Sequence, residues 1–420
     1  MDLKKKLGVL GLATGLVLSL AACGGGASDD KASSGDAKTL TISVDSGYKK
    51  YMDAIKGDFE KENNAKIKIV EKDMFEQLEA LPLDGPAGTA PDVMMSAYDR
   101  IGGLGQQGHL AEVKLGNKDA YDEKDKKQVT IDGKVYGAPA VIETLVLYYN
   151  KDLLDKAPET FGDLENLSKD ARFNFSSEKG KNIGFLAKWT DFYFSYGLLA
   201  GYGGYVFGDD GTNPKDIGLN NEGSVEGITY ATKWFQDVWP KGMQDNKSAD
   251  DFIQDQFVKG KTAAIIGGPW SAANYKEAKL NYGVAKIPTL PNGKEYSPFG
   301  GGKGWVISNY SKEKELAQKF VDYATNEKNQ TKFYDETNEV PANKAARAAA
   351  LDKNDELTNA VIGQYENAQP MPNIPEMAEV WTGAENLMFD AASGKKTPQK
   401  SADDAVKVIE DNISQNIPNK

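Results

Sequence analysis

The chain has 420 residues, of which 40% are hydrophobic and 10% aromatic, a globular composition long enough for two or three domains. Its formal net charge of −12 and isoelectric point near 4.9 argue against binding to nucleic acid. A single cysteine and a single histidine exclude an internal disulfide and argue against a transition-metal site. We therefore expect no cofactor and no metal.

The N-terminus has the order of a bacterial lipoprotein leader. Three lysines, Lys4 to Lys6, precede an apolar run from Leu7 to Leu20, and the small residues that follow lead to Cys23. The run is shorter than the roughly 20 apolar residues of a membrane-spanning helix. We predict that residues 1–22 are a signal peptide and that Cys23 becomes the lipidated first residue. The protein would then be extracytoplasmic, anchored to the outer face of the cell membrane.

Residues 23–38 are rich in glycine, serine, alanine and charge, which predicts a flexible tether. Beyond it, short β-favouring runs alternate with amphipathic helical patterns, as in α/β proteins. The predicted strands are 40–44, 66–71, 91–96, 262–267 and 304–308, together with an unusually long β-favouring stretch at 135–150.

Apolar residues at three- and four-residue spacing predict the helices. The first predicted helix has the apolar face Tyr48, Tyr51, Met52, Ile55 and Phe59. The second has the face Val225, Ile228, Ala231, Phe235 and Val238. The third, after Ser311, has the face Leu316, Phe320, Val321 and Ala324. The last helix is predicted to start at a Ser401 cap.

Catalytic motifs are nearly absent. Residues 103–108 (GLGQQG) match a dinucleotide fingerprint as a string, but the segment after them is too short for the required helix. His109 stands alone in a glycine-rich turn, which favours a structural role. Paired carboxylates are plentiful, so a glycoside hydrolase stays open as an alternative.

Several aromatic residues stand in loop-like or glycine-flanked places. They are 189–194 (WTDFYF), Trp270 after Gly268-Pro269, and Trp381 after Val380. Sugar rings pack their CH-rich faces on flat aromatic rings, and their hydroxyls bond to carboxylates and guanidinium groups. Asp99, Arg100, Glu143 and Asp191 supply those charged groups, although about half of such aromatics in any domain are core residues.

Five segments follow the order and motifs of a known family. They are 91–113 (PDVMMSAYDRIGGLGQQGHLAEV), 135–154 (VYGAPAVIETLVLYYNKDLL), 257–270 (FVKGKTAAIIGGPW), 281–293 (NYGVAKIPTLPNG) and 366–381 (ENAQPMPNIPEMAEVW). With them the chain resembles the maltose/maltodextrin-binding proteins, the extracytoplasmic solute receptors of ABC sugar importers. The resemblance implies an α/β, type II periplasmic-binding-protein-like fold, with a ligand cleft between two lobes joined by hinge crossovers.

The resemblance also implies boundaries and site residues. The N-terminal lobe would comprise 39–142 and 305–350, the C-terminal lobe 146–298 and 357–420, and the hinges would lie near 143–145, 299–304 and 351–356. The ligand-binding residues carried over are Asp45, Glu76, Asp99, Arg100, Glu143, Asp191, Phe192, Tyr193, Trp270, Met371 and Trp381.

Three positions depart from the family pattern. Ser96 stands where a third stacking tryptophan is expected, Ser46 where a lysine is expected, and Glu385 where an arginine is expected. These losses would either weaken disaccharide binding or shift preference towards longer or cyclic glucans.

The sequence thus predicts a monomeric, non-enzymatic receptor that delivers maltodextrins to an ABC transporter permease. The alternatives are a secreted α-glucan hydrolase with an Asp/Glu pair such as Glu143 and Asp99, a receptor for a different oligosaccharide, and a surface adhesin.

Overall fold

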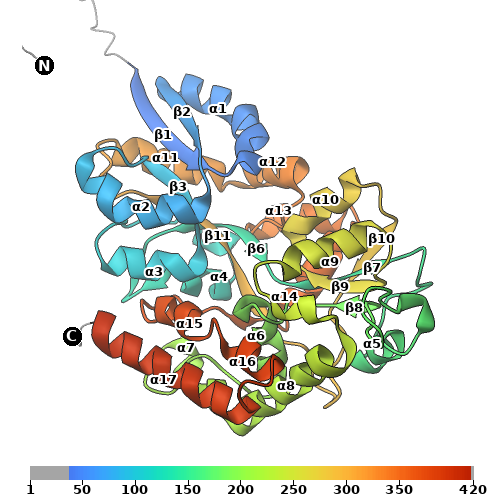
Figure 1. The fold of residues 1–420 in the computed structure, drawn as a ribbon. Helices are drawn as coiled ribbons and strands as arrows, with labels where there is room; N and C mark the ends of the chain where they lie inside the picture. Colours follow the sequence, from blue (N-terminus) through green and yellow to red (C-terminus); the bar gives the residue numbers. More distant parts are fainter. Residues whose placement is uncertain (1–36, 418–420) are drawn as a thin grey trace, which may run out of the picture. The chain divides into compact units, whose positions relative to one another are not determined.

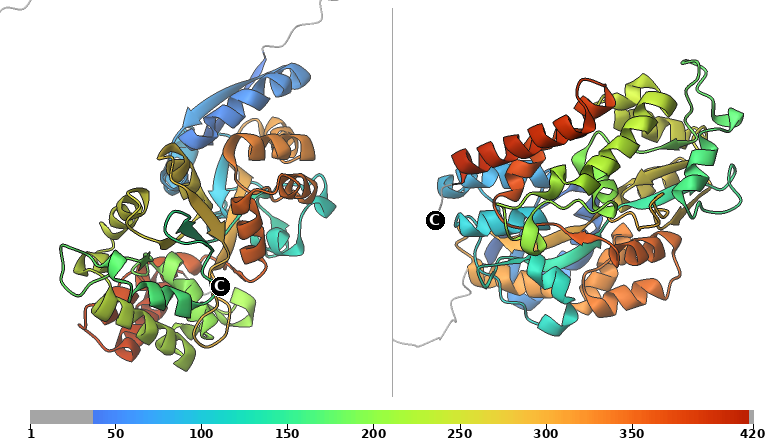
Figure 2. Two further views of the ribbon diagram at one scale, coloured as in Figure 1. Left: turned by 90° about the vertical axis from the view of Figure 1, so that its right-hand side faces the viewer. Right: turned by 90° about the horizontal axis from the view of Figure 1, so that it is seen from below.

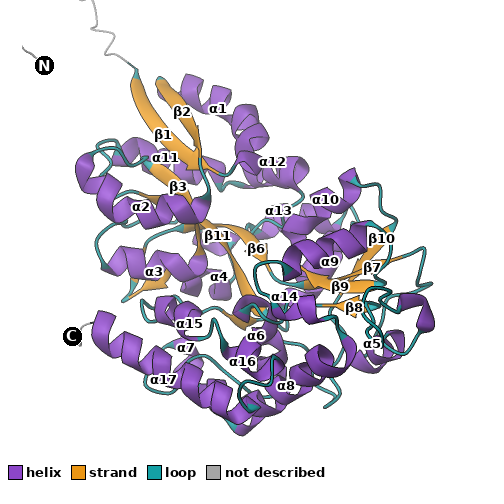
Figure 3. Cartoon of the chain, viewed as in Figure 1, coloured by secondary structure: helices purple, strands orange, loops and turns teal. Residues whose placement is uncertain are grey.

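Two β-sheets with helices packed around them organise the chain (Figures 1 and 3). The computed structural model describes residues 37–417, and the unit Lys38–Lys420 carries every element named below. The predicted signal peptide, Cys23 and nearly all of the predicted tether lie outside the described residues.

The first sheet is mixed and follows the order β12-β11-β3-β1-β2, with β6 also paired to β11. Its strands are β1 (Lys38–Val44), β2 (Ala65–Glu71), β3 (Val93–Ala97), β6 (Ala138–Glu143), β11 (Phe299–Ile307) and β12 (Gln369–Pro370). In the central strand β1, the alternating residues Leu40, Ile42 and Val44 are buried. The strand predicted at 40–44 from its β-favouring residues is confirmed as part of β1.

The second sheet has the order β10-β7-β9-β8. Its strands are β7 (Val146–Asn150), β8 (Phe185–Leu186), β9 (Ala264–Gly267) and β10 (Tyr282–Ala285), and a separate hairpin joins β4 (Thr130–Ile131) to β5 (Lys134–Val135). We call the elements around the first sheet the first lobe and those around the second sheet the second lobe.

Helices follow the strands in both lobes. In the first lobe they are α1 (Lys49–Asn63), α2 (Met74–Ala87), α3 (Tyr98–Gln106), α4 (Glu123–Gln128), α11 (Lys314–Ala324), α12 (Glu327–Thr337) and α13 (Lys344–Leu351). In the second lobe they are α5 (Phe161–Leu167), α6 (Phe192–Gly201), α7 (Gly208–Gly211), α8 (Glu222–Lys233), α9 (Ala249–Val258), α10 (Ala272–Glu277), α14 (Glu356–Tyr365), α15 (Met377–Gly383), α16 (Leu387–Ala392) and α17 (Pro398–Asn416). Figure 2 shows the red helix α17, which packs against α8, α15 and α16.

The long β-favouring stretch in the sequence is where the chain changes sheets. Strand β6 ends in the first sheet at Glu143, and β7 begins in the second at Val146. Between them, the Thr144 hydroxyl donates a 2.8 Å hydrogen bond to the Phe299 carbonyl at the start of β11. A Cβ at Gly302 would lie 1.9 Å from the Val141 carbonyl oxygen, so glycine is required where β11 meets β6.

Two helix predictions need correction. Helix α17 starts at Pro398, and its cap is Thr397, whose hydroxyl accepts the Lys400 N–H. Ser401 lies inside the helix, buried, and donates to the Leu387 carbonyl. The second difference is that α8 ends at Lys233 and continues as a wider π turn over Trp234–Val238.

A buried polar cluster joins α4 of the first lobe to α14 of the second. Asp125 is fully buried, and the Tyr365 hydroxyl donates a 2.8 Å hydrogen bond to one of its carboxylate oxygens. The other oxygen lies 3.9 Å from Nη1 of Arg347, which also pairs with Asp122. Burial raises the pKa of Asp125 to about 6, although Tyr365, Arg347 and neighbouring Lys124 oppose the rise.

The substitution Asp125→Asn should reveal this titration in the free energy of unfolding. The folded state binds the Asp125 proton more tightly than the unfolded state does, so wild-type stability is lost as pH rises from about 4 to about 6. Relative to the variant, the wild type should lose up to about 3 kcal/mol across that interval. Urea unfolding at several pH values measures the difference.

Asp53→Asn is the control of opposite sign, because Lys56 and Lys49 hold the pKa of exposed Asp53 below its usual value. For this pair the wild type should gain stability over the variant as pH rises. If the free energies of unfolding of the wild type and Asp125→Asn differ by the same amount from pH 4 to pH 7, Asp125 does not titrate with a raised pKa.

Candidate functional site

A buried charge cluster lies where β6 and β11 run side by side. Lys303 on β11 places Nζ 3.0 Å from a carboxylate oxygen of Glu143, at the end of β6, and 3.0 Å from one of Glu339, after α12. Nζ also donates a 2.9 Å hydrogen bond to the Tyr48 hydroxyl, which in turn donates to Glu339. One lysine thus connects the crossover strands to two other segments of the first lobe.

Burial and charge act in opposite directions in this cluster. Burial alone lowers the pKa of Lys303, but Glu143 and Glu339 outweigh it and hold the pKa well above its usual value. Burial raises the pKa of Glu143, while Lys303 opposes that rise. The lysine therefore stays charged, and it largely compensates two carboxylates that would otherwise repel each other.

A cavity of about 820 Å³ opens from this cluster between the two lobes. Asp45, Tyr48, Lys303 and Glu339 line it from the first lobe, and Trp270 and Tyr282 line it from the second. Trp270 lies in a short helical turn after β9 and is 44% exposed, so a large flat ring faces accessible space. The cavity therefore offers carboxylates and a cation on one side and an indole on the other.

Asp45 stands at the end of β1, where the chain turns towards the first lobe's helices. One of its carboxylate oxygens accepts the Met74 N–H at 3.1 Å, which connects it to the start of α2. Burial raises the pKa of Asp45, whereas Lys303 lowers it. Asp45 and Lys303 therefore interact electrostatically in the same cavity.

A second contact between the lobes joins α3 to α15. The indole Nε1 of Trp381 donates a 3.1 Å hydrogen bond to the carboxylate of Asp99, in the first turn of α3. Nε of Arg100 lies 3.4 Å from the same carboxylate. Burial raises the pKa of Asp99, and Arg100 and Trp381 oppose that rise.

The loop and helix start at 191–193 connect the aromatic residues of the site. Asp191 caps α6 by accepting the Tyr193 N–H. The ring of Phe192 lies 5.8 Å from that of Trp381, and the ring of Tyr193 lies 6.1 Å from that of Trp270. Burial, and then the charge of Glu143, raises the pKa of Tyr193. These residues therefore lie between the cavity and the Asp99–Trp381 contact.

The remaining residues carried over from the resemblance fall in different places. Met371 is buried, with its terminal methyl beside Gly301 of β11. Glu76 is exposed in the first turn of α2. It is not among the residues that line the cavity, and neither are Asp99, Arg100, Glu143, Asp191, Phe192, Tyr193, Met371 and Trp381. Trp189, grouped with the candidate aromatics in the sequence, is instead fully buried and donates to the Tyr296 hydroxyl.

The departures from the family pattern have distinct environments. Ser96 is fully buried in β3 and its hydroxyl donates to the Ala97 carbonyl, so this position presents no surface for stacking. Ser46 and Glu385 are exposed. His109 shares a 2.9 Å hydrogen bond with the Tyr310 hydroxyl, in agreement with its predicted structural role.

Sequence reasoning did not identify Lys303, Tyr48 and Glu339 as residues of the site. The available signal was a lone charged residue after three glycines, Gly300 to Gly302, inside a predicted crossover. Tyr48 was assigned to a helix face, and nothing in its spacing indicates that its hydroxyl contacts Lys303.

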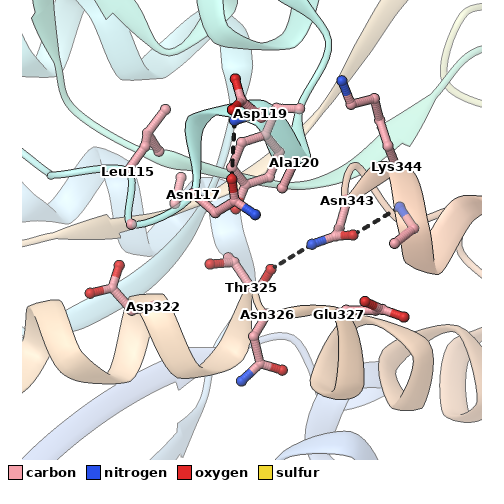
Figure 4. A pocket seen from close by; sticks show the side chains of 14 residues that line it. Leu115, Asn117, Asp119, Ala120, Asp322, Thr325, Asn326, Glu327, Asn343 and Lys344 are labelled. Atoms are coloured by element: carbon pink, nitrogen blue, oxygen red, sulfur yellow. Dashed lines mark hydrogen bonds between the residues drawn. The ribbon is translucent and has the colours of Figure 1, made fainter.

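Another cavity, of about 510 Å³, lies within the first lobe between the 115–121 loop, α11, α12 and the start of α13 (Figure 4). Its polar side chains support the local backbone. Asn117 accepts the Asp119 N–H, and Asn343 donates to the Thr325 carbonyl while accepting the Ala345 N–H. We therefore place the candidate site in the larger cavity between the lobes.

Within residues 37–417, no group of three or more histidine, cysteine, aspartate or glutamate side chains is arranged to hold a metal ion. Over the same described range, no helix is both long enough and apolar enough to cross a membrane.

Comparisons with known proteins show the family to which the chain belongs. A sequence model of the bacterial extracellular solute-binding proteins matches residues 54–360. The chain is 67% identical over 413 residues to the maltodextrin-binding protein MdxE of Bacillus subtilis (strain 168), with 98% of each sequence covered.

Two solved structures are also similar. The first is the maltose-binding periplasmic protein MalE from Listeria monocytogenes in complex with maltose, with 83% identity, a TM-score of 0.85, and coverage of 91% of this chain and 100% of that one. The second is MalX from Streptococcus pneumoniae in complex with maltopentaose. It has 55% identity, a TM-score of 0.86, and coverage of 89% of this chain and 100% of that one. The predicted two-lobed α/β fold is thereby confirmed, and the chain belongs to the bacterial extracellular solute-binding protein family.

Proposed function

We propose that this protein is an extracytoplasmic receptor that binds maltodextrins between its lobes and delivers them to the permease of an ABC transporter. The observation that carries the proposal is the cavity between the lobes, where an exposed indole faces Asp45 and the charged Lys303 cluster. Two proteins similar to it over nearly their full length are named for maltodextrin and maltose binding, which supports this ligand.

The site provides the two kinds of surface that a glucan needs. The indole faces of Trp270 and Trp381 pack against the CH-rich faces of glucose rings. Asp45, Asp99 and Glu143 accept hydrogen bonds from hydroxyls, and Arg100 donates them, with the charge strengthening each bond. Asp191, Phe192 and Tyr193 contact the glucan from the second lobe, and Met371 adds an apolar contact near β11. We assign Glu76 a peripheral role, in agreement with its exposure on α2.

Lys303 also suggests how the protein compensates for Ser46. The family pattern has a lysine after the first cleft aspartate, and here that position is an exposed serine. Lys303 brings a positive charge to the cavity that Asp45 lines, but from β11 instead of from the end of β1. We propose that it supplies the missing cation.

Delivery requires the two lobes to move relative to each other. We propose that the lobes comprise 39–142 with 305–350 and 146–298 with 357–420, connected by hinges near 143–145, 299–304 and 351–356. Sugar that touches both lobes favours the closed arrangement, because it interacts more strongly with that arrangement than with the open one. The permease then recognises the surfaces aligned by closure.

The family consists of binding proteins, and we propose that this member performs no covalent chemistry. The hydrolase alternative needs an available pair such as Glu143 and Asp99. Here Glu143 forms an ion pair with Lys303, and Asp99 accepts a hydrogen bond from the indole N–H of Trp381. We further propose that the receptor acts as a monomer and is held at the membrane through lipidated Cys23.

Calorimetric titration with maltose, maltotriose and longer maltodextrins tests the proposed function. We expect binding, and we expect Trp270→Ala to weaken it by about 1–3 kcal/mol, because a stacking surface at the centre of the site is removed. Phe389→Ala is the matched control, since Phe389 is also exposed, at 36%, but lies on α16. No binding of any α-glucan by the folded wild type would refute the ligand assignment.

An assay for reducing ends on maltodextrin incubated with the protein separates the receptor from the hydrolase. We expect no increase over the sugar alone, because the family consists of binding proteins. Product that accumulates with the wild type and disappears with Glu143→Gln would favour the enzyme instead.

Lys303→Met should destabilise the protein by about 3–5 kcal/mol at pH 7, because it leaves two buried carboxylates without their cation. The loss should be smaller at pH 4, because burial raises the pKa of Glu143 and its protonation removes an unpaired charge. Adding Glu143→Gln and Glu339→Gln to Lys303→Met removes the unpaired charges and should restore most of the stability.

That triple variant should still bind maltotriose more weakly than the wild type does, which separates binding from folding. Urea unfolding and calorimetry give the two measurements. A Lys303→Met protein as stable as the wild type would show that the cluster carries no such constraint.

A further inference from the structure

A small groove of about 180 Å³ lies between α2, α3 and the segment leading into α15, outside the cavity described above. It starts at Asp99 and Arg100 and continues along α3 past Gly103 and Leu104 to Gln107. These positions are three or four residues apart, so they form one face of the helix. The groove therefore extends along one face of α3 from Asp99 and Arg100.

The opposite wall of this groove presents an aromatic ring. Phe75 in the first turn of α2 is 44% exposed, whereas the apolar residues Met74 and Leu78 on either side of it are buried. The guanidinium carbon of Arg100 lies 5.8 Å from the centre of the Phe75 ring. A large ring that is not needed for the core thus lies next to a cation of the candidate site.

The groove also has polar groups available. Among the described residues, Nε of Arg100 is buried without an acceptor in hydrogen-bond geometry, and its nearest carboxylate is that of Asp99, 3.4 Å away. Glu79 and Gln107 add a carboxylate and an amide, while Pro82 and Pro375 supply apolar surface. Gly103 bears no side chain where α3 passes Pro375, so the groove stays open there.

We propose that this groove is an accessory subsite for one further glucosyl unit of a bound maltodextrin, with Phe75 as its stacking platform. The inference rests on the proposed function and specifies its substrate as chains longer than those the cavity holds. A flat ring, a guanidinium group and a carboxylate beside apolar surface form a combination suited to a sugar ring with hydroxyls at its edge. Asp99 and Arg100, which we also assign to glucan binding, line this groove, and Phe75 directly follows Met74, whose N–H bonds to Asp45 of the cavity, so we assign the groove to the same glucan chain.

The subsite also explains how the protein can do without an aromatic residue at position 96. Ser96 is buried in β3 and cannot stack on sugar. Phe75 supplies a third aromatic platform from α2, at a different place, after Trp270 and Trp381. A platform displaced in this way favours longer chains over disaccharides.

The experiment compares maltotriose with maltoheptaose by calorimetry for the wild type, Phe75→Ala and Phe75→Tyr. We expect the wild type to bind maltoheptaose more tightly than maltotriose, and the ratio of the two affinities to fall by about 2- to 10-fold in Phe75→Ala. Phe75→Tyr keeps the ring and should keep the ratio. Leu83→Ala is the matched control, since Leu83 is on the same helix, 77% exposed and outside the groove.

The outcomes distinguish the subsite from the function on which it rests. If the wild type binds maltotriose and the affinity ratio is the same in Phe75→Ala, the accessory subsite is wrong and the receptor assignment stands. If no α-glucan binds to the folded wild type, both are wrong. A ratio that falls equally in Leu83→Ala would also overturn the role of Phe75.

Discussion

The charge of Lys303, buried between Glu143 and Glu339, is the constraint on which the site depends. Its pairing fixes the end of β6 against β11, and these strands run together where the chain passes from one sheet to the other. A buried cation is stable only with compensating anions, and buried carboxylates need that cation equally. Charges that line a ligand cavity are therefore held in place before any ligand arrives, which reduces the cost of ordering them on binding.

The two lobes contribute different chemistry to the proposed glucan site. The first lobe supplies Asp45, Asp99 and the Lys303 cluster at the ends of strands and at the start of α3. The second lobe supplies Trp270, Trp381 and the aromatic start of α6. A ligand with both apolar faces and hydroxyl edges interacts fully only when it touches both lobes. This requirement connects recognition to closure in a solute-binding protein.

Local sequence patterns predicted several strands and four helices, because apolar residues in these segments match one buried face. The same patterns failed where tertiary contacts decide the outcome. Ser401 has the chemistry of a cap, yet Thr397 followed by Pro398 starts the helix and Ser401 packs inside. Trp189 stands beside the site residues in sequence but fills the core of the second lobe. The sequence did not indicate Lys303 as a site residue, because its partners lie 36, 160 and 255 positions away along the chain.

The most direct test is a crystal structure of the protein grown with maltotriose. We predict that the sugar lies in the cavity between the lobes, with one ring on the indole of Trp270 and hydroxyls within hydrogen-bond distance of Asp45 or the Lys303 cluster. Maltotriose bound elsewhere, with Trp270 facing solvent and the lobes unchanged around an unoccupied cavity, would contradict this mechanism of recognition.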